Sequence, residues 1–416
     1  MAVRSPAMAL FAGLALVPAA NAACLSVEEA VSLARNVSPQ VASANYTVDQ
    51  GEAVFDGVKA QQRPQVSGFV RSGLGDGLLQ SAQLDNQYGV ELSYKLFDFG
   101  RAKFKKKSAI ADIEASEANV ARVEEAVSGR LLEALIELRM ARTLIGLYEA
   151  RLELLATRLE TADKQLEQNT ITLMDHSRLH SEAATTRYEL TDVRARSRSA
   201  GLAVESLLRD PAACVTTDDL QVYLLARKSE TIEVLVSDVN AHPRLLELEK
   251  RITAADYQRR SLSREWLPEI SASAYSSQVY NDALDQFQDR DRVGIQIAAP
   301  LYDGGVRSSE VGRMRARVNQ LEAEYVAMED QLKAQKLTSW SRYHLLEDSL
   351  SALDRAVESA NAHIQATRTR YDMRAGTVDD LLEAEQRLMN LQIRYQYVQA
   401  QHMAMLIDLA RPDSLD

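Results

Sequence analysis

The segment ELSYKLFDFGRAKFKKK, residues 91–107, changes its pattern halfway along. In its first half apolar and polar residues alternate, which is typical of a strand with two different faces. After Asp98 the sequence becomes basic and favours a helix. The segment GIQIAAPLYDGGVRSSE, residues 294–310, has the same design. We therefore expect two strand-to-helix hinges, in which Asp98 and Asp303 cap the helix start and Gly100 and Gly305 permit the sharp turn.

The two hinges belong to a tandem duplication. Pro39 and Pro64 lie 25 positions apart, as do Pro243 and Pro268. Adding 205 maps the hinge residues of the first copy onto those of the second, and adding 207 maps Thr170 onto Thr377. A nearly constant offset over such a length indicates two copies of one structural unit.

Each copy reads as a helix, two strands and a long helical hairpin. The proline-free stretches 65–210 and 301–411 are rich in helix-forming residues, so each can hold uninterrupted helix. Apolar residues at 4-3 spacing in both stretches predict packing along a coiled coil. About 65 residues between hinge and turn would span roughly 100 Å. We expect a signal peptide at 1–22 and a first repeat at 23–210, with strands near 65–72 and 88–97 and a hairpin near 101–209. A linker at 211–229 leads to a second repeat at 230–410, with strands near 269–276 and 293–301 and a hairpin near 305–409. Residues 411–416 form a C-terminal tail.

The N-terminus has the features of a secretory signal peptide. Arg4 precedes a short apolar run, and Ala20-Asn21-Ala22 matches an A-x-A cleavage site. In an oxidising envelope compartment Cys24 and Cys214 can form a disulfide, and lipidation of Cys24 is the alternative. Asn21 stands where bacterial lipoproteins usually have Leu, which favours the disulfide.

The strands have the alternating pattern of transmembrane β-strands. One face of the first hinge strand carries Tyr88, Val90, Leu92, Tyr94 and Leu96, and the same positions in the second copy are Val293, Ile295, Ile297, Ala299 and Leu301. Alternation over 9–11 residues suits a strand with one face to lipid and one to water. An antiparallel sheet covered on one side by helices is the competing interpretation. Four strands per chain cannot close a membrane barrel, whose minimum is about eight, so several chains would have to share one.

Taken together, the signal peptide, the duplicated halves, the strand ends LFDFG and LYDGG and the late segment AGTVDDLLEAEQRLMNLQIRY resemble the TolC-like outer-membrane efflux protein family. The resemblance covers essentially the whole mature chain. It implies a mainly α-helical fold with a small β-barrel contribution. Specifically, it implies a homotrimer in which four strands per chain form a twelve-stranded barrel in the outer membrane, continued by an α-helical tunnel through the periplasm. It also implies outer-membrane lipid, a periplasmic adaptor and an inner-membrane transporter of ABC or RND type as partners.

Acidic residues at the second hairpin turn are candidates for a periplasmic aperture. Similar proteins carry acidic positions there, which Asp380 and Glu383 match, and Asp379 is adjacent. Like charges around a narrow axis favour cations. The competing interpretation is that they stabilise the first turn of a helix. We take Asp175 as the counterpart of Glu383 in the first hairpin. The turns themselves, at Asn169, Thr170, Gly376 and Thr377, are the expected docking points for an adaptor.

Other motifs have simpler interpretations. The DFG at 98–100 lacks every other kinase motif. His176 and His180 have the i, i+4 spacing of metal ligands and Asp175 is adjacent, but no further ligand cluster accompanies them, so we expect solvent-facing histidines. The basic run at 101–107 is either a solvated helix face or a contact to anionic lipid headgroups.

The expected function is a passive exit duct in the outer membrane of a Gram-negative bacterium. We recognise no nucleophile, cofactor loop or metal site, so we expect no enzyme and no cofactor. The net charge of −11 argues against nucleic-acid binding. The strand end FDFG is similar to family members that serve type I protein secretion, and multidrug efflux is the alternative. A periplasmic adaptor or structural coiled-coil protein is the rival from another class.

Overall fold

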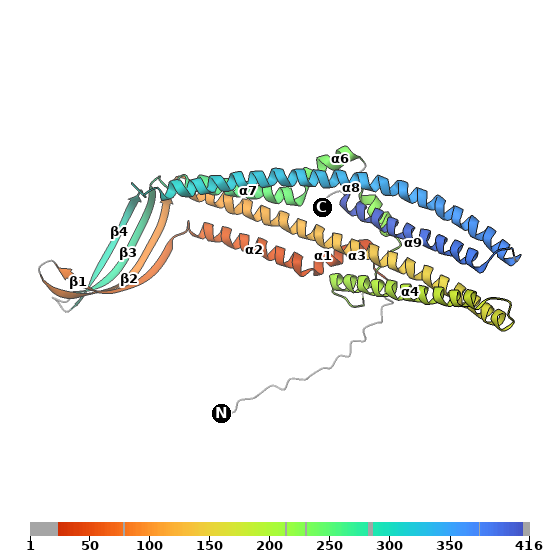
Figure 1. Ribbon diagram of the computed structural model, residues 1–416. Coiled ribbons are helices and arrows are strands. Elements are labelled where there is room, and N and C mark those ends of the chain that lie inside the picture. Colours follow the sequence, from red (N-terminus) through yellow and green to blue (C-terminus); the bar gives the residue numbers. More distant parts are fainter. Residues whose placement is uncertain are drawn as a thin grey trace, which may run out of the picture.

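The computed structural model describes residues 24–77, 80–212, 214–228, 231–281, 286–373 and 375–410, without the side chains of 73–86 and 281. The expected signal peptide and C-terminal tail lie outside the described residues. The molecule is elongated, with a sheet at one end, the turns of two helical hairpins at the other, and helices between them (Figure 1). None of the described helices combines the length and the apolar character needed to cross a membrane.

The first copy begins with two consecutive helices, α1 (Val27–Val37) and α2 (Pro39–Ala60). We expected a single helix here. Ser38 is extended and caps α2, and Pro39 takes the first helical position, where its missing N–H costs nothing. Strands β1 (Gln65–Gly77) and β2 (Gln80–Phe97) follow, and then the hairpin of α3 (Arg101–Glu167) and α4 (Leu173–Leu208).

The second copy repeats this order after a short helical region. The expected linker contains α5 (Leu220–Arg227), and α6 (Ile232–Ser237), η1 (Asp238–Ala241) and α7 (Pro243–Leu262) replace the single helix that we expected. Strands β3 (Glu269–Asn281) and β4 (Gln286–Ala298) lead to the hairpin of α8 (Val306–Asp372) and α9 (Val378–Asp408). The helices α3 and α8 have 67 residues each, or about 100 Å of helix.

The four strands form one antiparallel sheet in the order β1-β2-β3-β4. β1, β2 and β3 extend beyond the expected ranges because the ladder continues through polar residues that show no alternation. β4 begins earlier than expected for the same reason, but it ends at Ala298, before Pro300, which has no N–H to donate. The expected strand residue Leu301 therefore lies outside the sheet. Gly89 is required by close packing, since a Cβ there would lie 2.4 Å from the carbonyl oxygen of Ser276.

The two hinges have the same geometry, as predicted. The carboxylate of Asp98 accepts hydrogen bonds from the N–H groups of Gly100 and Ala102 at 3.0 and 2.7 Å. The carboxylate of Asp303 accepts bonds from the N–H groups of Gly305 and Arg307 at 3.0 and 3.1 Å, and these bonds lower its pKa. Gly100 and Gly305 have φ values of 83° and 94°, a region that residues with a Cβ avoid.

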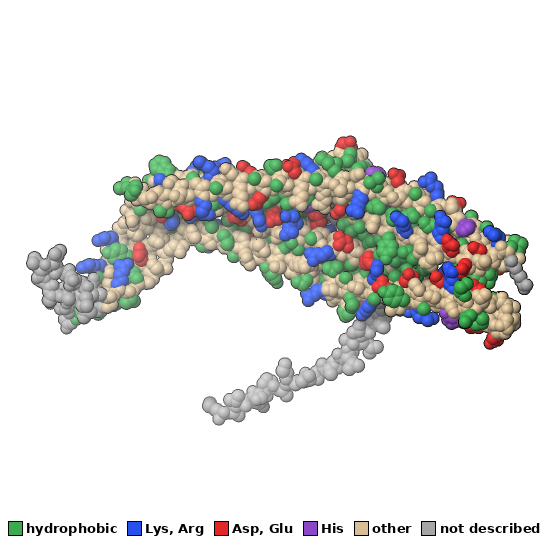
Figure 2. All heavy atoms as spheres, in the orientation of Figure 1, with side chains coloured by type: hydrophobic (Ala, Val, Ile, Leu, Met, Phe, Trp, Pro, Cys, Tyr) green, Lys and Arg blue, Asp and Glu red, His purple; other side chains and the backbone are tan. Residues whose placement is uncertain are grey.

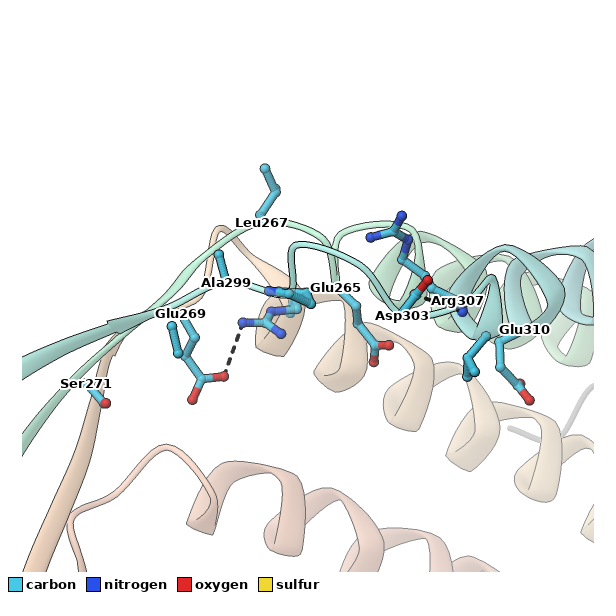
Figure 3. A pocket seen from close by; sticks show the side chains of 12 residues that line it. Glu265, Leu267, Glu269, Ser271, Ala299, Asp303, Arg307 and Glu310 are labelled. Atoms are coloured by element: carbon cyan, nitrogen blue, oxygen red, sulfur yellow. Dashed lines mark hydrogen bonds and ion pairs between the residues drawn. The ribbon is translucent and has the colours of Figure 1, made fainter.

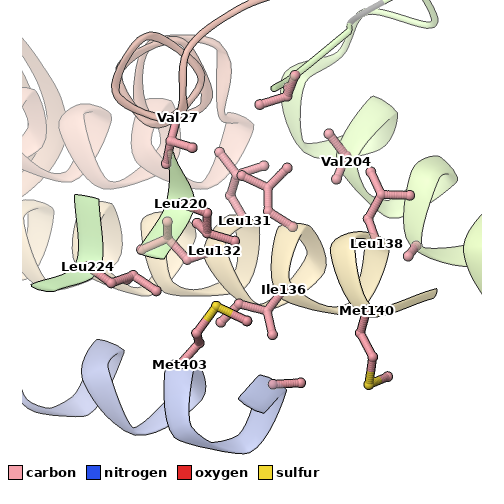
Figure 4. Close-up of a cluster of buried hydrophobic side chains, with 14 of the residues drawn as sticks. Val27, Leu131, Leu132, Ile136, Leu138, Met140, Val204, Leu220, Leu224 and Met403 are labelled. Carbon is pink, nitrogen blue, oxygen red and sulfur yellow. The ribbon is translucent and has the colours of Figure 1, made fainter. Parts of the chain in front are cut away.

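The largest apolar core lies midway along the helices, where α1, α3, α4, α5 and α9 meet (Figure 4). Its fully buried side chains include Val27, Leu131, Leu220 and Leu406. Beside it, Cys24 and Cys214 form a disulfide with a Cα–Cα distance of 4.6 Å, and Leu25 bridges to Val215. Of the two possibilities for Cys24, the structure carries the disulfide. The segment that joins the copies is therefore part of the core rather than a bare linker.

Candidate functional site

The sheet has one apolar and one polar face. Across the ladder, Val66, Leu92, Ala274 and Val293 occupy paired positions on one face. On the other face Ser67, Glu91, Tyr275 and Arg292 are paired in the same way. Among the described residues no helix covers these apolar side chains: Val70 is 83% exposed and Val293 is 84% exposed. The competing interpretation, a sheet packed on one side by helices, does not describe this arrangement.

The outer edges of the sheet belong to β1 and β4, which pair with β2 and β3 alone among the described strands. Unpaired backbone groups at a sheet edge are a template for a further strand, and in lipid each one costs several kcal/mol. A single copy of the chain therefore presents two edges that require partners if the sheet lies in a membrane.

A cleft of about 630 Å³ lies where β3 and β4 meet α8 (Figure 3). Glu265, Glu269 and Glu310 are among its lining residues, together with Asp303 of the hinge. Glu269 forms ion pairs with Arg101 at 3.1 Å and with Lys95 at 3.4 Å. The first residue of α3 is thereby tied to the start of β3, so that the hinge of one copy is fixed to the strands of the other.

Within the basic run at 101–107, Arg101 is held in the ion pair with Glu269, and the Nζ atom of Lys107 lies 5.2 Å from the ring centroid of Tyr257. Lys103 and Lys105 are exposed just beyond the sheet. These two remain candidates for contact with lipid headgroups.

At the opposite end, both hairpin turns close with the same capping box. Thr172 caps α4 and exchanges hydrogen bonds with Asp175, and Thr377 caps α9 and does the same with Asp380. The hydrogen bonds from Thr377 lower the pKa of Asp380, which keeps this carboxylate ionised.

This geometry corrects the alignment of the two turns. The helix starts and caps keep the offset of 205, so Thr172 rather than Thr170 corresponds to Thr377. Likewise Asp175 corresponds to Asp380, not to Glu383. The offset of 207 is misleading because the first turn sequence, QNTIT, contains two threonines, Thr170 and Thr172, whereas RAGTV contains only Thr377. Asn169 has a φ of 53° and lies in the turn, where Asn tolerates this conformation.

The candidate aperture residues occupy different environments. Asp380 and Glu383 line a small cavity of about 190 Å³ together with Gly376. Arg370, Arg387 and His363 line the same cavity, so its charge is mixed rather than purely acidic. Asp379 lies outside this cavity and pairs with Arg178 of the first hairpin at 2.6 Å. Figure 2 likewise shows acidic and basic side chains intermixed over this end of the molecule.

Ion pairs between the two hairpins are the contacts that sequence reasoning did not assign. Besides Arg178–Asp379, both Arg151 and Arg158 of α3 bond the carboxylate of Glu385 on α9. Arg151 and Glu385 are 6% and 8% exposed. Farther along, Arg196 donates a hydrogen bond to the Tyr397 hydroxyl at 2.9 Å. The partners are more than 200 positions apart, so only the folded duplication brings them together.

The structure also changes the interpretation of His176 and His180. Asp163 of α3 lies opposite them, with its Oδ1 atom 2.6 Å from Nε2 of His176. One ligand atom from each of the three residues lies within 4.8 Å of the others. The structure thus adds a carboxylate from the facing helix to the two histidines, of which His180 is exposed as expected and His176 is only partly exposed. The hairpin folds residue 163 against residue 176 because both lie about equally far from the turn.

Comparisons with known proteins agree with this architecture. Residues 237–411 match the family model described as "Outer membrane efflux protein". The outer membrane efflux protein BepC of Brucella suis is 21% identical over 346 residues, which cover 83% of this chain and 75% of BepC.

Solved structures with the same fold include a membrane protein from Pseudomonas aeruginosa, with 18% identity, 93% and 92% of the two chains covered and a TM-score of 0.81. The outer membrane protein VceC of Vibrio cholerae has 18% identity, coverage of 92% and 94% and a TM-score of 0.76. At these identities the structures establish the fold.

Proposed function

We propose that this chain is a member of the outer-membrane efflux protein family, whose model residues 237–411 match, and that three copies form a passive exit duct. Each copy contributes four strands to a twelve-stranded barrel in the outer membrane of a Gram-negative bacterium. The helices continue the bore through the periplasm. Cargo passes through the water-filled interior, and an inner-membrane transporter supplies the energy.

One observation carries this proposal: a four-stranded sheet with one apolar face and two open edges stands at the end of helices about 100 Å long. Lipid contact satisfies the apolar face, and sister chains satisfy the edges. Two copies would give eight strands, whose interior side chains fill the bore, whereas three give twelve and leave a pore.

The ends of the two hairpins are the expected docking surface for a periplasmic adaptor. The turns at Asn169, Thr170, Gly376 and Thr377 are mostly exposed and lie farthest from the sheet. The ties Arg178–Asp379 and Arg158–Glu385 hold the two hairpins of one copy together near this end. We propose that Asp380 and Glu383 face the bore here and make the aperture selective for cations.

We assign the duct first to type I protein secretion, because the strand end LFDFG is similar to that of family members serving this process. Small-molecule efflux is the second candidate, favoured by the name of BepC as an efflux protein. Co-purification with a cross-linker distinguishes the two, because an ABC transporter indicates type I secretion and an RND transporter indicates drug efflux.

The proposed duct is tested by the mass of the purified protein in detergent and by its conductance in a planar lipid bilayer. We expect three chains of 46.2 kDa, less the signal peptide, and discrete ion currents. A monodisperse single chain without conductance would contradict the duct. It would favour the periplasmic adaptor as the rival, in which case the protein should fractionate with soluble or inner-membrane material.

A further inference from the structure

Two helices of the first hairpin bring together a potential metal-ligand set that no known role of the chain uses. We propose that Asp163, His176 and His180 bind one first-row divalent transition-metal ion, with Zn²⁺ as the best fit. The set combines two imidazoles on α4 with one carboxylate on α3.

The donor chemistry selects the class of ion. Two imidazole nitrogens and one carboxylate oxygen, with a fourth position left to water, are a usual ligand set for Zn²⁺. Ca²⁺ and Mg²⁺ prefer oxygen ligands throughout. Soft ions such as Cu(I) prefer thiolates and thioethers, and none of the three residues supplies sulfur.

The geometry needs little adjustment to close around an ion. His176 and His180 are one helical turn apart, and their ring centroids are separated by 4.6 Å. In a tetrahedral zinc site with bonds of about 2.1 Å, neighbouring ligand atoms lie about 3.4 Å apart. The three ligand atoms here lie within 4.8 Å, so side-chain rotations alone can supply the difference.

The short contact between Asp163 and His176 defines where the ion would sit. The Nε2–H group of His176 donates a hydrogen bond to Oδ1 of Asp163, with the two heavy atoms 2.6 Å apart. The ion replaces this hydrogen, the proton leaves to solvent, and both atoms become ligands. Lys164 does not compete for the carboxylate of Asp163, since its ammonium group pairs with Glu160 at 2.8 Å.

An ion can reach the three ligand residues from solvent, and apolar packing between α3 and α4 holds these residues in place. The side chain of Asp163 is 59% exposed, which leaves the site open to ions, whereas that of His176 is 16% exposed and held against the hairpin. Leu179, adjacent on α4, is buried in a small apolar cluster with Leu155 and Ala162 of α3, which fixes the two helices at this level. A bound ion would join α3 and α4 close to the turn.

The second hairpin provides an internal comparison. At the offset of 205 the corresponding residues are Arg368, Leu381 and Glu385. Leu381 is buried, and Glu385 is occupied by Arg151 and Arg158. The ligand set is therefore a property of the first hairpin alone, and we expect one ion per chain.

Zinc titration calorimetry on the full-length protein, purified in detergent without a polyhistidine tag, tests this inference. The wild type should bind one Zn²⁺ per chain that the variant His180→Ala does not bind, and Asp163→Asn should weaken that binding by at least about tenfold. His363→Ala, which removes an exposed histidine of the second hairpin, is the matched control and should bind as the wild type does.

A second readout protects against variants that alter folding. Zn²⁺ should raise the thermal midpoint of the wild type and of His363→Ala, but not that of His180→Ala, because an ion that binds only the folded state stabilises it. Equal stoichiometry and affinity in the wild type and His180→Ala would overturn the proposal, and the contact of Asp163 with His176 would then be a hydrogen bond only. This outcome is independent of whether the chain forms a duct.

Discussion

The two long helices α3 and α8 begin at the same kind of hinge, have equal length and end before the same capping box. Their surroundings nevertheless differ. α3 packs against α2, α4, α7 and α9, whereas α8 packs mainly against α7 and α9. Accordingly 18 side chains of α3 are buried and only 7 of α8. Of the two equivalent helices, α3 is therefore enclosed by other helices of the chain, whereas α8 lies at the periphery of the helical part.

This difference identifies α8 as the long helix that a single chain leaves mostly uncovered. Along α8 the large apolar side chains of Val306, Val326 and Leu345 are more than half exposed. These side chains are spread along α8 rather than gathered in one patch, so their exposure shows only that this helix is less covered than α3. On the trimer proposal a sister chain covers α8, much as α2 and α7 cover α3 within the chain.

The largest effect on the contact between the hairpins should come from Glu385→Ala. It leaves the buried guanidinium of Arg151 without its carboxylate, and breaking such a pair costs about 3–5 kcal/mol. We expect a clear fall in the midpoint of chemical unfolding. Glu383→Ala, two positions away and exposed, is the control and should change the midpoint little.

The equivalence of the hinges can be tested by Gly100→Ala and Gly305→Ala. Both residues have positive φ, so a Cβ costs about 1–2 kcal/mol at either site. Gly100→Ala should be slightly the more harmful, since its Cβ would lie 2.8 Å from Nη1 of Arg264 and displace this group from the Phe99 carbonyl oxygen, to which it donates a hydrogen bond. Gly305 has only Ser308 Oγ at 3.6 Å. Heat stability of the assembled oligomer on gels measures this. A harmless Gly305→Ala would show that the second hinge does not need its left-handed turn.

The two capping aspartates separate a structural role from an aperture role. Asp175→Ala and Asp380→Ala remove the same capping box, so both should lower thermal stability by a similar small amount. Only Asp380→Ala should weaken cation selectivity in planar-bilayer recordings. Unchanged selectivity in both variants would leave Asp380 as a helix cap and remove the aperture assignment.

The smallest effect concerns pH and the packing of α9 on α8. His402 of α9 stacks on Tyr343 of α8 at 4.4 Å, and its Nε2 is buried without a hydrogen-bond partner among the described residues. Burial, followed by the nearby Lys228 and His344, lowers the pKa of His402 against the opposing effect of Glu347.

Because the folded state prefers neutral His402, this stability is complete above the unfolded pKa of about 6.5 and is lost as the pH falls through the folded value. Thermal midpoints measured from pH 8 downward should fall less steeply in His402→Phe than in the wild type. Parallel profiles in the two proteins would contradict this role, and His363→Ala should follow the wild type.

The sequence predicted what local patterns encode. The duplication, the four strands, both hinges and the two long hairpins follow from periodicity, proline spacing and the Asp-x-Gly turns. Pairings between the copies could not be predicted in this way. Arg178 with Asp379 and Arg151 with Glu385 are contacts between helices that lie over 200 residues apart, and nothing in either local sequence identifies its partner. The contact between Asp163 and His176 could have been predicted, because the two residues lie at nearly equal distances in sequence from the hairpin turn and so face each other on its two helices.

The central claim is that the edges β1 and β4 of neighbouring chains pair, and disulfide cross-linking tests it most directly. Within one chain these strands lie three strand spacings apart, about 14 Å, which is too far for a disulfide. Both native cysteines are already paired. Ser67→Cys combined in turn with cysteine at Arg292, Gly294 or Gln296 should give covalent dimers and trimers on a non-reducing gel for at least one pair. Monomers alone in all three combinations, with a folded protein in the membrane fraction, would contradict a barrel shared between chains.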